Sequence, residues 1–122
     1  MNFIHSDAAP AALGPYSQAV QVGNLVFVSG QLPIKDGQLI DDPAQATTAA
    51  LDNLLAIVQA AGGQKTSFAK VNIFVRNMDD FDTINTAYAA FFGDHKPARA
   101  CVQVARLPKD AVLEIEVIAE LS

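Results

Sequence analysis

Residues 97–121 have the sequence PARACVQVARLPKDAVLEIEVIAEL, which divides into two strand-like segments around a turn. In the second segment, residues 112–121, apolar side chains alternate with others, and this period of two is typical of a half-buried β-strand. The first segment, residues 98–106, is also expected to be a strand, and the connection at 107–110 contains proline and aspartate, which favour turns. We therefore predict that the chain ends in an antiparallel hairpin.

Alternation along these two strands also groups their polar side chains. The three glutamates of the chain, Glu114, Glu116 and Glu120, share one face of the last strand, and Arg99 and Cys101 share one face of the strand before it. If the apolar faces of both strands meet helices, Arg99 and Cys101 lie on the same surface as the glutamates. An arginine can bind a carboxylate through two parallel hydrogen bonds, and a glutamate can position water or transfer a proton.

Simpler interpretations of the same residues stay open. The pattern alone favours a solvated sheet face or a cross-strand ion pair for these charges. Cys101 alone is typical of a small packing residue, because a thiol nucleophile usually needs a base beside it and neither His5 nor His95 forms a recognisable pair with it.

The rest of the chain is predicted to supply four more strands and two helices. Asp42-Pro43 is typical of a helix start, Gly62-Gly63 of a helix stop, and Gly23-Asn24 of a hairpin turn. An aromatic stripe on the second helix is expected to be core. The expected elements are strands at 3–4, 17–22, 25–29, 68–76, 98–106 and 112–121, and helices at 43–61 and from Asn77 or Met78 through Phe92. The order βββαβαββ predicts an α+β fold, a single mixed sheet with two helices on one face, forming one domain over residues 1–122.

Composition narrows the classes of function. The net charge is −5 at pH 7, and the eight basic residues are scattered, so nucleic acid is an unfavourable partner. A single cysteine, the absence of a signal-peptide pattern and the absence of a membrane-spanning apolar run predict a cytoplasmic protein. Two distant histidines, without a P-loop or dinucleotide fingerprint, predict a site free of metal and cofactor.

Several motifs, taken together, resemble the RidA subgroup of the reactive-intermediate deaminase family, also called the YjgF family. The matching segments, in chain order, are Gly14-Pro15-Tyr16-Ser17-Gln18-Ala19, Val28-Ser29-Gly30-Gln31, Asp80-Phe81-Asp82-Thr83-Ile84-Asn85 with Tyr88 and Phe91-Phe92, Pro97 through Val102, Leu107 through Asp110, and Glu114-Ile115-Glu116. Their order and spacing extend over nearly the whole chain.

The resemblance implies a chorismate-mutase-like fold and a homotrimer whose sheets face inward and leave a cleft between each pair of subunits. It also implies hydrolysis of 2-aminoacrylate and related 2-imino acids, released by pyridoxal-phosphate enzymes, to 2-keto acids and ammonia, which is metabolite damage control. By position, Arg99 would bind the substrate carboxylate with help from the Gly30 amide, and Glu114 would activate water or transfer protons. The remaining lining residues would be Tyr16, Ser29 and Cys101.

Two departures from the family pattern place the preferred substrate in question rather than the reaction. Ala100 follows the arginine where relatives often have serine or threonine, and the connection at 93–96 is short. Two other functions stay open: a non-catalytic module that binds small carboxylates or client proteins, and a ribonuclease, which the acidic charge balance disfavours. A dimer would also hide the polar sheet faces.

Overall fold

The computed structural model describes residues 1–122, and its central feature is a six-stranded mixed sheet in the order β1-β2-β3-β8-β6-β7. The strands are β1 (Asn2–Ile4), β2 (Ala19–Val22), β3 (Leu25–Gln31), β6 (Phe68–Val75), β7 (Ala98–Gln103) and β8 (Leu113–Glu120). Every neighbouring pair is antiparallel except β6 and β7, which are parallel. The predicted α+β class with one main mixed sheet is confirmed.

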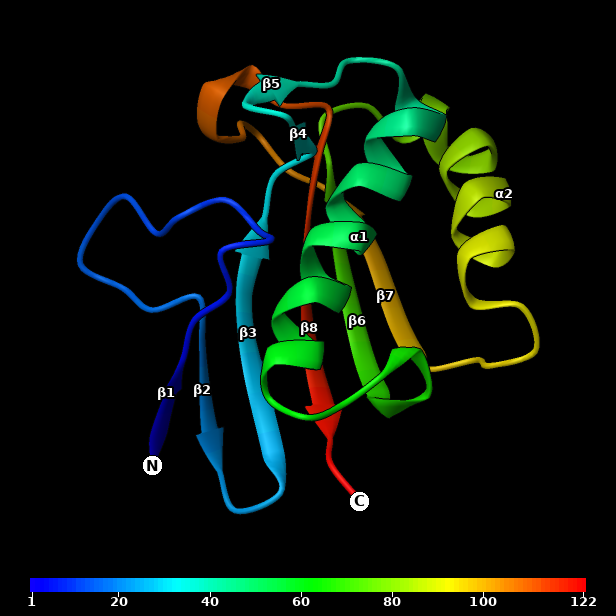
Figure 1. Cartoon of the computed structure of the whole chain (residues 1–122). Helices are drawn as coiled ribbons and strands as arrows, with labels where there is room; N and C mark the ends of the chain where they lie inside the picture. Colours follow the sequence, from blue (N-terminus) through cyan, green and yellow to red (C-terminus); the bar gives the residue numbers. More distant parts are fainter.

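Two helices, α1 (Pro43–Ala60) and α2 (Phe81–Phe92), both lie against one face of this sheet (Figure 1). Asp42 begins α1 as predicted, since its side chain accepts a hydrogen bond from the Gln45 amide at 2.9 Å and Pro43 occupies the first turn. Gly62, at a φ of +97°, follows the helix end as expected. Short 3₁₀ turns are η1 (Lys65–Ser67), η2 (Met78–Asp80) and η3 (Pro108–Asp110).

The core lies between the helices and the sheet. Leu51, Leu54 and Ile57 of α1 are fully buried, as are Leu113 and Ile115 of β8. In α2, the predicted aromatic stripe does pack inward. Its buried members are Tyr88 and Phe92 beside Ile84. No helix is both long and apolar enough to cross a membrane.

The predicted hairpin of the last two strands is wrong. β7 pairs in parallel with β6, while β8 lies between β3 and β6. The unit β6–α2–β7 is a crossover, which is how parallel neighbours are normally connected. β8 takes the central position because its inward residues are fully apolar, whereas β7 is almost entirely exposed and lies at the sheet edge. A local turn signal cannot distinguish these two arrangements.

A small second sheet was not predicted. β4 (Ile34–Lys35) and β5 (Gln38–Leu39) form a two-stranded hairpin between β3 and α1. Its turn residues, Asp36 and Gly37, both have positive φ, at 52° and 76°, as a tight hairpin turn requires. Each strand is only two residues long, which is too short to show a period of two in the sequence.

The Asp42 cap gives the first prediction. Asp42→Ala removes the acceptor of the Gln45 amide and is expected to lower the free energy of unfolding by about 1 kcal/mol. The neighbouring Asp41→Ala is the control, because Asp41 is exposed and makes no side-chain hydrogen bond. Urea unfolding at one fixed protein concentration measures both, and equal losses in the two variants would contradict the capping role.

Candidate functional site

Glu114 lies on the sheet face that the helices leave open. Its neighbours along β8, Leu113 and Ile115, are fully buried under the helices, so alternation turns the Glu114 side chain to the opposite side. There it lies directly over Gly30 of β3, and a Cβ atom at position 30 would be 2.8 Å from both Cδ and Oε1 of the carboxyl group. Any side chain at position 30 would therefore displace the Glu114 carboxyl group from this place.

The Glu114 carboxyl group is easier to protonate than an ordinary glutamate. Partial burial raises its pKa, and the nearby charge of Glu116 raises it further. Glu116 itself accepts a hydrogen bond from Asn72 Nδ2 at 3.1 Å. A carboxyl group in this state can both release and take up a proton closer to neutral pH, as general acid–base chemistry requires.

Glu114, Gly30 and Tyr16 line one pocket of about 350 Å³. Its other walls come from the N-terminal segment, the end of β3 and the loop after β7, and include Pro10, Leu13, Leu32 and Lys109. Ser29 is not part of this pocket. Its hydroxyl donates to the Ser17 carbonyl at 2.6 Å, and its side chain borders a neighbouring hollow beside Glu116.

Arg99 lies elsewhere, on the outer strand β7. Its sheet partner Val71 is fully buried under the helices, so Arg99 points to the helix-covered side. Arg99 Nη1 donates to Asn85 Oδ1 of α2 at 2.6 Å, and the guanidinium lies 4.8 Å from the Tyr88 ring centroid and 5.6 Å from that of Phe81. These contacts hold the guanidinium against α2.

The prediction that Arg99 and Cys101 share a surface with Glu114 is therefore wrong within one chain. Alternation along each strand was predicted correctly, but the polar side of β7 faces the margin of α2 rather than the open face. Polar side chains can face the helix side of β7 because β7 is an edge strand that the helices cover only in part. Cys101, next to Arg99 on the same side, is partly buried, and burial raises the pKa of its thiol while the Arg99 charge opposes that shift.

Sequence reasoning missed the residues of α2 that hold Arg99. Phe81, Asn85 and Tyr88 are spaced four and three residues apart, which places them on one helix face. A polar Asn85 inside an otherwise aromatic face is the signal that was available. Tyr88 was classed with the core, and its hydroxyl is buried without a hydrogen-bond partner; burial raises the pKa of that hydroxyl, again opposed by Arg99.

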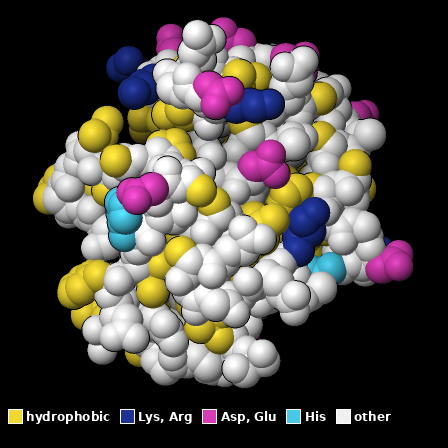
Figure 2. All heavy atoms as spheres, viewed as in Figure 1, with side chains coloured by type: hydrophobic (Ala, Val, Ile, Leu, Met, Phe, Trp, Pro, Cys, Tyr) yellow, Lys and Arg dark blue, Asp and Glu magenta, His cyan; other side chains and the backbone are white.

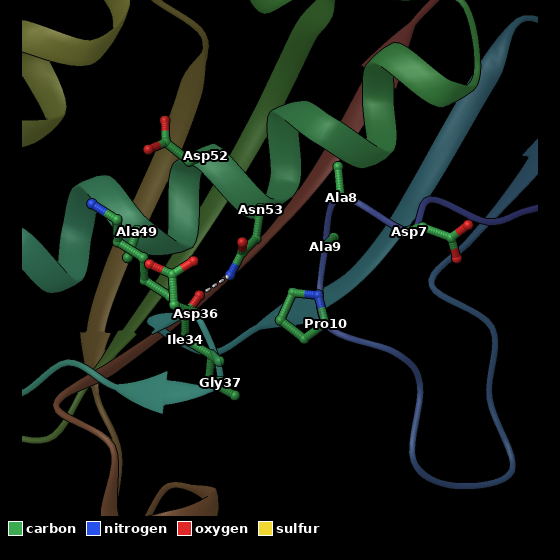
Figure 3. Close-up of a pocket in the computed structure, with 11 residues that line it drawn as sticks. Asp7, Ala8, Ala9, Pro10, Ile34, Asp36, Gly37, Ala49, Asp52 and Asn53 are labelled. Atoms are coloured by element: carbon green, nitrogen blue, oxygen red, sulfur yellow. Dashed lines mark hydrogen bonds between the residues drawn. The ribbon is translucent and has the colours of Figure 1, made fainter.

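A second pocket, of about 470 Å³, lies on the other side of the N-terminal segment (Figure 3). It shares only Pro10 and Ile34 with the pocket that contains Glu114. Its other walls come from the turn of the β4–β5 hairpin and from one face of α1. The N-terminal segment therefore separates two distinct hollows.

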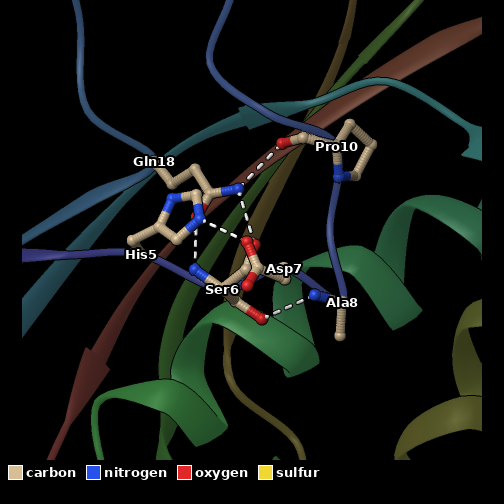
Figure 4. A network of polar contacts seen from close by, with 6 residues as sticks. All are labelled: His5, Ser6, Asp7, Ala8, Pro10 and Gln18. Carbon is tan, nitrogen blue, oxygen red and sulfur yellow. Dashed lines mark hydrogen bonds and ion pairs between the residues drawn. The ribbon is translucent and has the colours of Figure 1, made fainter.

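The buried side chain of Gln18 fixes this segment in place (Figure 4). Gln18 Oε1 accepts from the Ser6 amide at 2.7 Å, and Nε2 donates to the carbonyls of Ser6 and Pro10 at 3.1 and 2.8 Å. His5 pairs with Asp7 at 2.7 Å on the exposed side. Both pockets thus have a wall anchored by the residue that precedes β2. No group of three or more His, Cys, Asp or Glu side chains is placed to hold a metal ion.

Comparison with known proteins gives consistent matches over the full chain. The family model described as Endoribonuclease L-PSP matches residues 6–121. The 2-iminobutanoate/2-iminopropanoate deaminase of Escherichia coli K12 is 48% identical over 121 residues, covering 95% of this chain and 94% of that protein. A RutC family protein of Pasteurella multocida is 46% identical over 122 residues, with 95% of each covered.

The fold matches solved structures equally well. The crystal structure of Escherichia coli TdcF with bound serine matches this chain with a TM-score of 0.96 and 44% sequence identity. The match covers 100% of both chains. The family-model match, the sequence identity and the shared fold together show that this chain belongs to the reactive-intermediate deaminase family, also called the YjgF or Rid family.

Proposed function

We propose that the protein hydrolyses 2-imino acids such as 2-iminopropanoate and 2-iminobutanoate, together with their enamine form 2-aminoacrylate, to 2-keto acids and ammonia. Intermediates of this kind are released by pyridoxal-phosphate enzymes, so the role would be metabolite damage control. The observation that supports this most is the Glu114 carboxyl group, which has a raised pKa and lies over Gly30 in a pocket. The deaminases among its relatives give the substrate class.

In the proposed reaction the substrate enters with its carboxylate toward Arg99. A guanidinium can bind a carboxylate through two parallel hydrogen bonds, and the Gly30 amide would add a third donor. Asn85, Tyr88 and Phe81 occupy one side of the guanidinium, which leaves its other edge for the substrate. Tyr16, Ser29 and Cys101 are proposed to line the site around the substrate.

Glu114 then serves the chemical step. Water adds to the imine carbon, which is already electrophilic, while Glu114 accepts the proton of that water. The proton passes to nitrogen, and the resulting carbinolamine collapses to the keto acid and expels ammonia, so that one water is consumed for each ammonia released. Orientation and proton transfer account for such catalysis without a further group.

This proposal requires more than one subunit. Within a chain, Arg99 is on the helix-covered side of the sheet and Glu114 is on the open side, so a small substrate cannot contact both. We propose that the β7 edge of one subunit lies against the open face of the next in a closed homotrimer. Large apolar side chains exposed on that open face support an interface there: Phe3 is 71% exposed, Val22 51%, Phe27 40% and Val102 46%.

The description of the family model names an endoribonuclease, which offers a second candidate function. On the helix-covered face, Lys and Arg side chains are separated from one another and interspersed with acidic ones (Figure 2). The whole chain has a net charge of −5, so the electrostatic attraction that binds a polyanion is lacking. The deaminase therefore has the stronger support.

Activity of two variants tests the proposed roles. Arg99→Ala is expected to lower kcat/KM roughly 10- to 100-fold, because a charged hydrogen bond to the substrate is lost. Glu114→Gln is expected to lower kcat by roughly 100-fold or more. The assay measures keto acid release from enzymatically generated 2-iminopropanoate, corrected for spontaneous hydrolysis.

The control for this assay is Arg106→Ala, since Arg106 is exposed and makes no hydrogen bond or ion pair. All variants are compared at matched folded concentration, checked by thermal unfolding. A folded wild type that accelerates the hydrolysis of no imino acid tested would overturn the proposal.

The pH dependence gives a second test. If the ionised Glu114 carboxylate accepts the proton, activity falls as the pH decreases through its raised pKa. Glu116→Gln removes a neighbouring negative charge, so it lowers the pKa of Glu114 and moves the acid limb of the kcat/KM profile to lower pH. Glu120→Gln, an exposed glutamate at the end of β8, should leave that limb in place. Equal displacement by both variants would contradict the assignment.

A further inference from the structure

The 470 Å³ pocket on the far side of the N-terminal segment is separate from the proposed deaminase site. Three stretches of chain converge on it: residues 7–10, the β4–β5 turn and one face of α1 (Figure 3). Neither Arg99, Glu114, Gly30 nor Tyr16 lines it. The proposed reaction makes no use of this space.

Asn53 of α1 is the most informative residue of this pocket. It is only 8% exposed, and its amide nitrogen donates to the carbonyls of Ile34 at 2.9 Å and Leu32 at 3.3 Å. Figure 3 shows its side chain extending from α1 toward the hairpin. Its Oδ1 atom accepts no hydrogen bond, although the residue lines the pocket. An amide oxygen without a protein partner in a pocket can accept a hydrogen bond from a ligand that supplies an N–H donor.

Charged side chains of both signs line the same pocket as Asn53. Lys35, Asp36 and Asp52 line the same pocket, and none of them forms an ion pair. The remaining acid, Asp7, pairs with His5. The intervening wall is apolar and consists of small side chains such as Ala8, Ala9 and Ala49.

We propose that this pocket binds a small aliphatic α-amino acid in its zwitterionic form. The ammonium group donates to Asn53 Oδ1 and to the Asp36 carboxylate, and the ligand carboxylate pairs with the Lys35 ammonium group. The aliphatic side chain contacts the alanine wall. A simple amine would leave Lys35 unpaired beside it, and a simple carboxylate would be repelled by Asp36 and Asp52, so the mixed charges favour a ligand that has both groups.

Calorimetric titration with L-valine tests this site, with isobutylamine and 3-methylbutanoate as ligands that each lack one charged group. L-Valine is expected to bind with a dissociation constant of about 1 mM or tighter, and each half-ligand at least about tenfold more weakly. Lys35→Met and Asp36→Asn are expected to weaken L-valine binding by at least about tenfold. Asn tolerates the positive φ at position 36, so the turn is retained. Lys96→Met, at an exposed lysine outside the pocket, should bind like the wild type.

Amide NMR shifts and one more variant distinguish this pocket from the deaminase site. Binding that persists in Arg99→Ala, with shifts at Ala8 and Gly37, supports the proposal. Binding that disappears in Arg99→Ala, with shifts centred on Gly30, would overturn it, as would the absence of heat and of shifts in the wild type. Because no turnover is measured, failure of the deaminase proposal leaves this test intact.

Discussion

Burial of Leu113, Ile115 and Val117 under the helices determines the direction of every other side chain on the central strand. Because the side-chain period of a strand is two, these contacts force Glu114 and Glu116 onto the open face. A slip of one residue would turn the carboxylates of Glu114, Glu116 and Glu120 toward the helices and expose the three apolar side chains. Core packing therefore fixes the face on which the proposed proton-transfer group lies, and the missing side chain at Gly30 leaves room for its carboxyl group.

The same sheet separates the two halves of the proposed site. β7, at the outer edge, directs Arg99 to the helix side, where Asn85, Tyr88 and Phe81 hold the guanidinium. The imine carbon and the carboxylate of the proposed substrate are adjacent atoms, so they cannot reach across a sheet. The proposed neighbouring subunit would resolve this conflict, and it would also cover the exposed apolar side chains of the open face.

The fold was largely predictable from sequence because its signals are local. Asp42-Pro43 and Gly62 predicted α1, and alternation predicted β6 and β8. The partner of β7 was not predictable from sequence. A turn between β7 and β8 is compatible both with direct pairing of the two strands and with a third strand between them, and β6 occupies that place. For the site, Glu114 was placed on the correct face of its strand, whereas the side of the sheet that Arg99 faces depended on α2 and was predicted wrongly. The roles of both residues stay predictions.

The central claim, that each site combines Arg99 of one subunit with Glu114 of another, is tested most directly by mixing inactive subunits. Arg99→Ala and Glu114→Ala chains, carrying different tags, are co-expressed and the mixed oligomers are purified. If each site takes the two residues from neighbouring chains, one of the three sites in every purified mixed trimer is intact, so about a third of the wild-type activity returns in oligomers built from two inactive variants. If both residues act within one chain, no intact site forms, and the mixed oligomers remain as inactive as either parent.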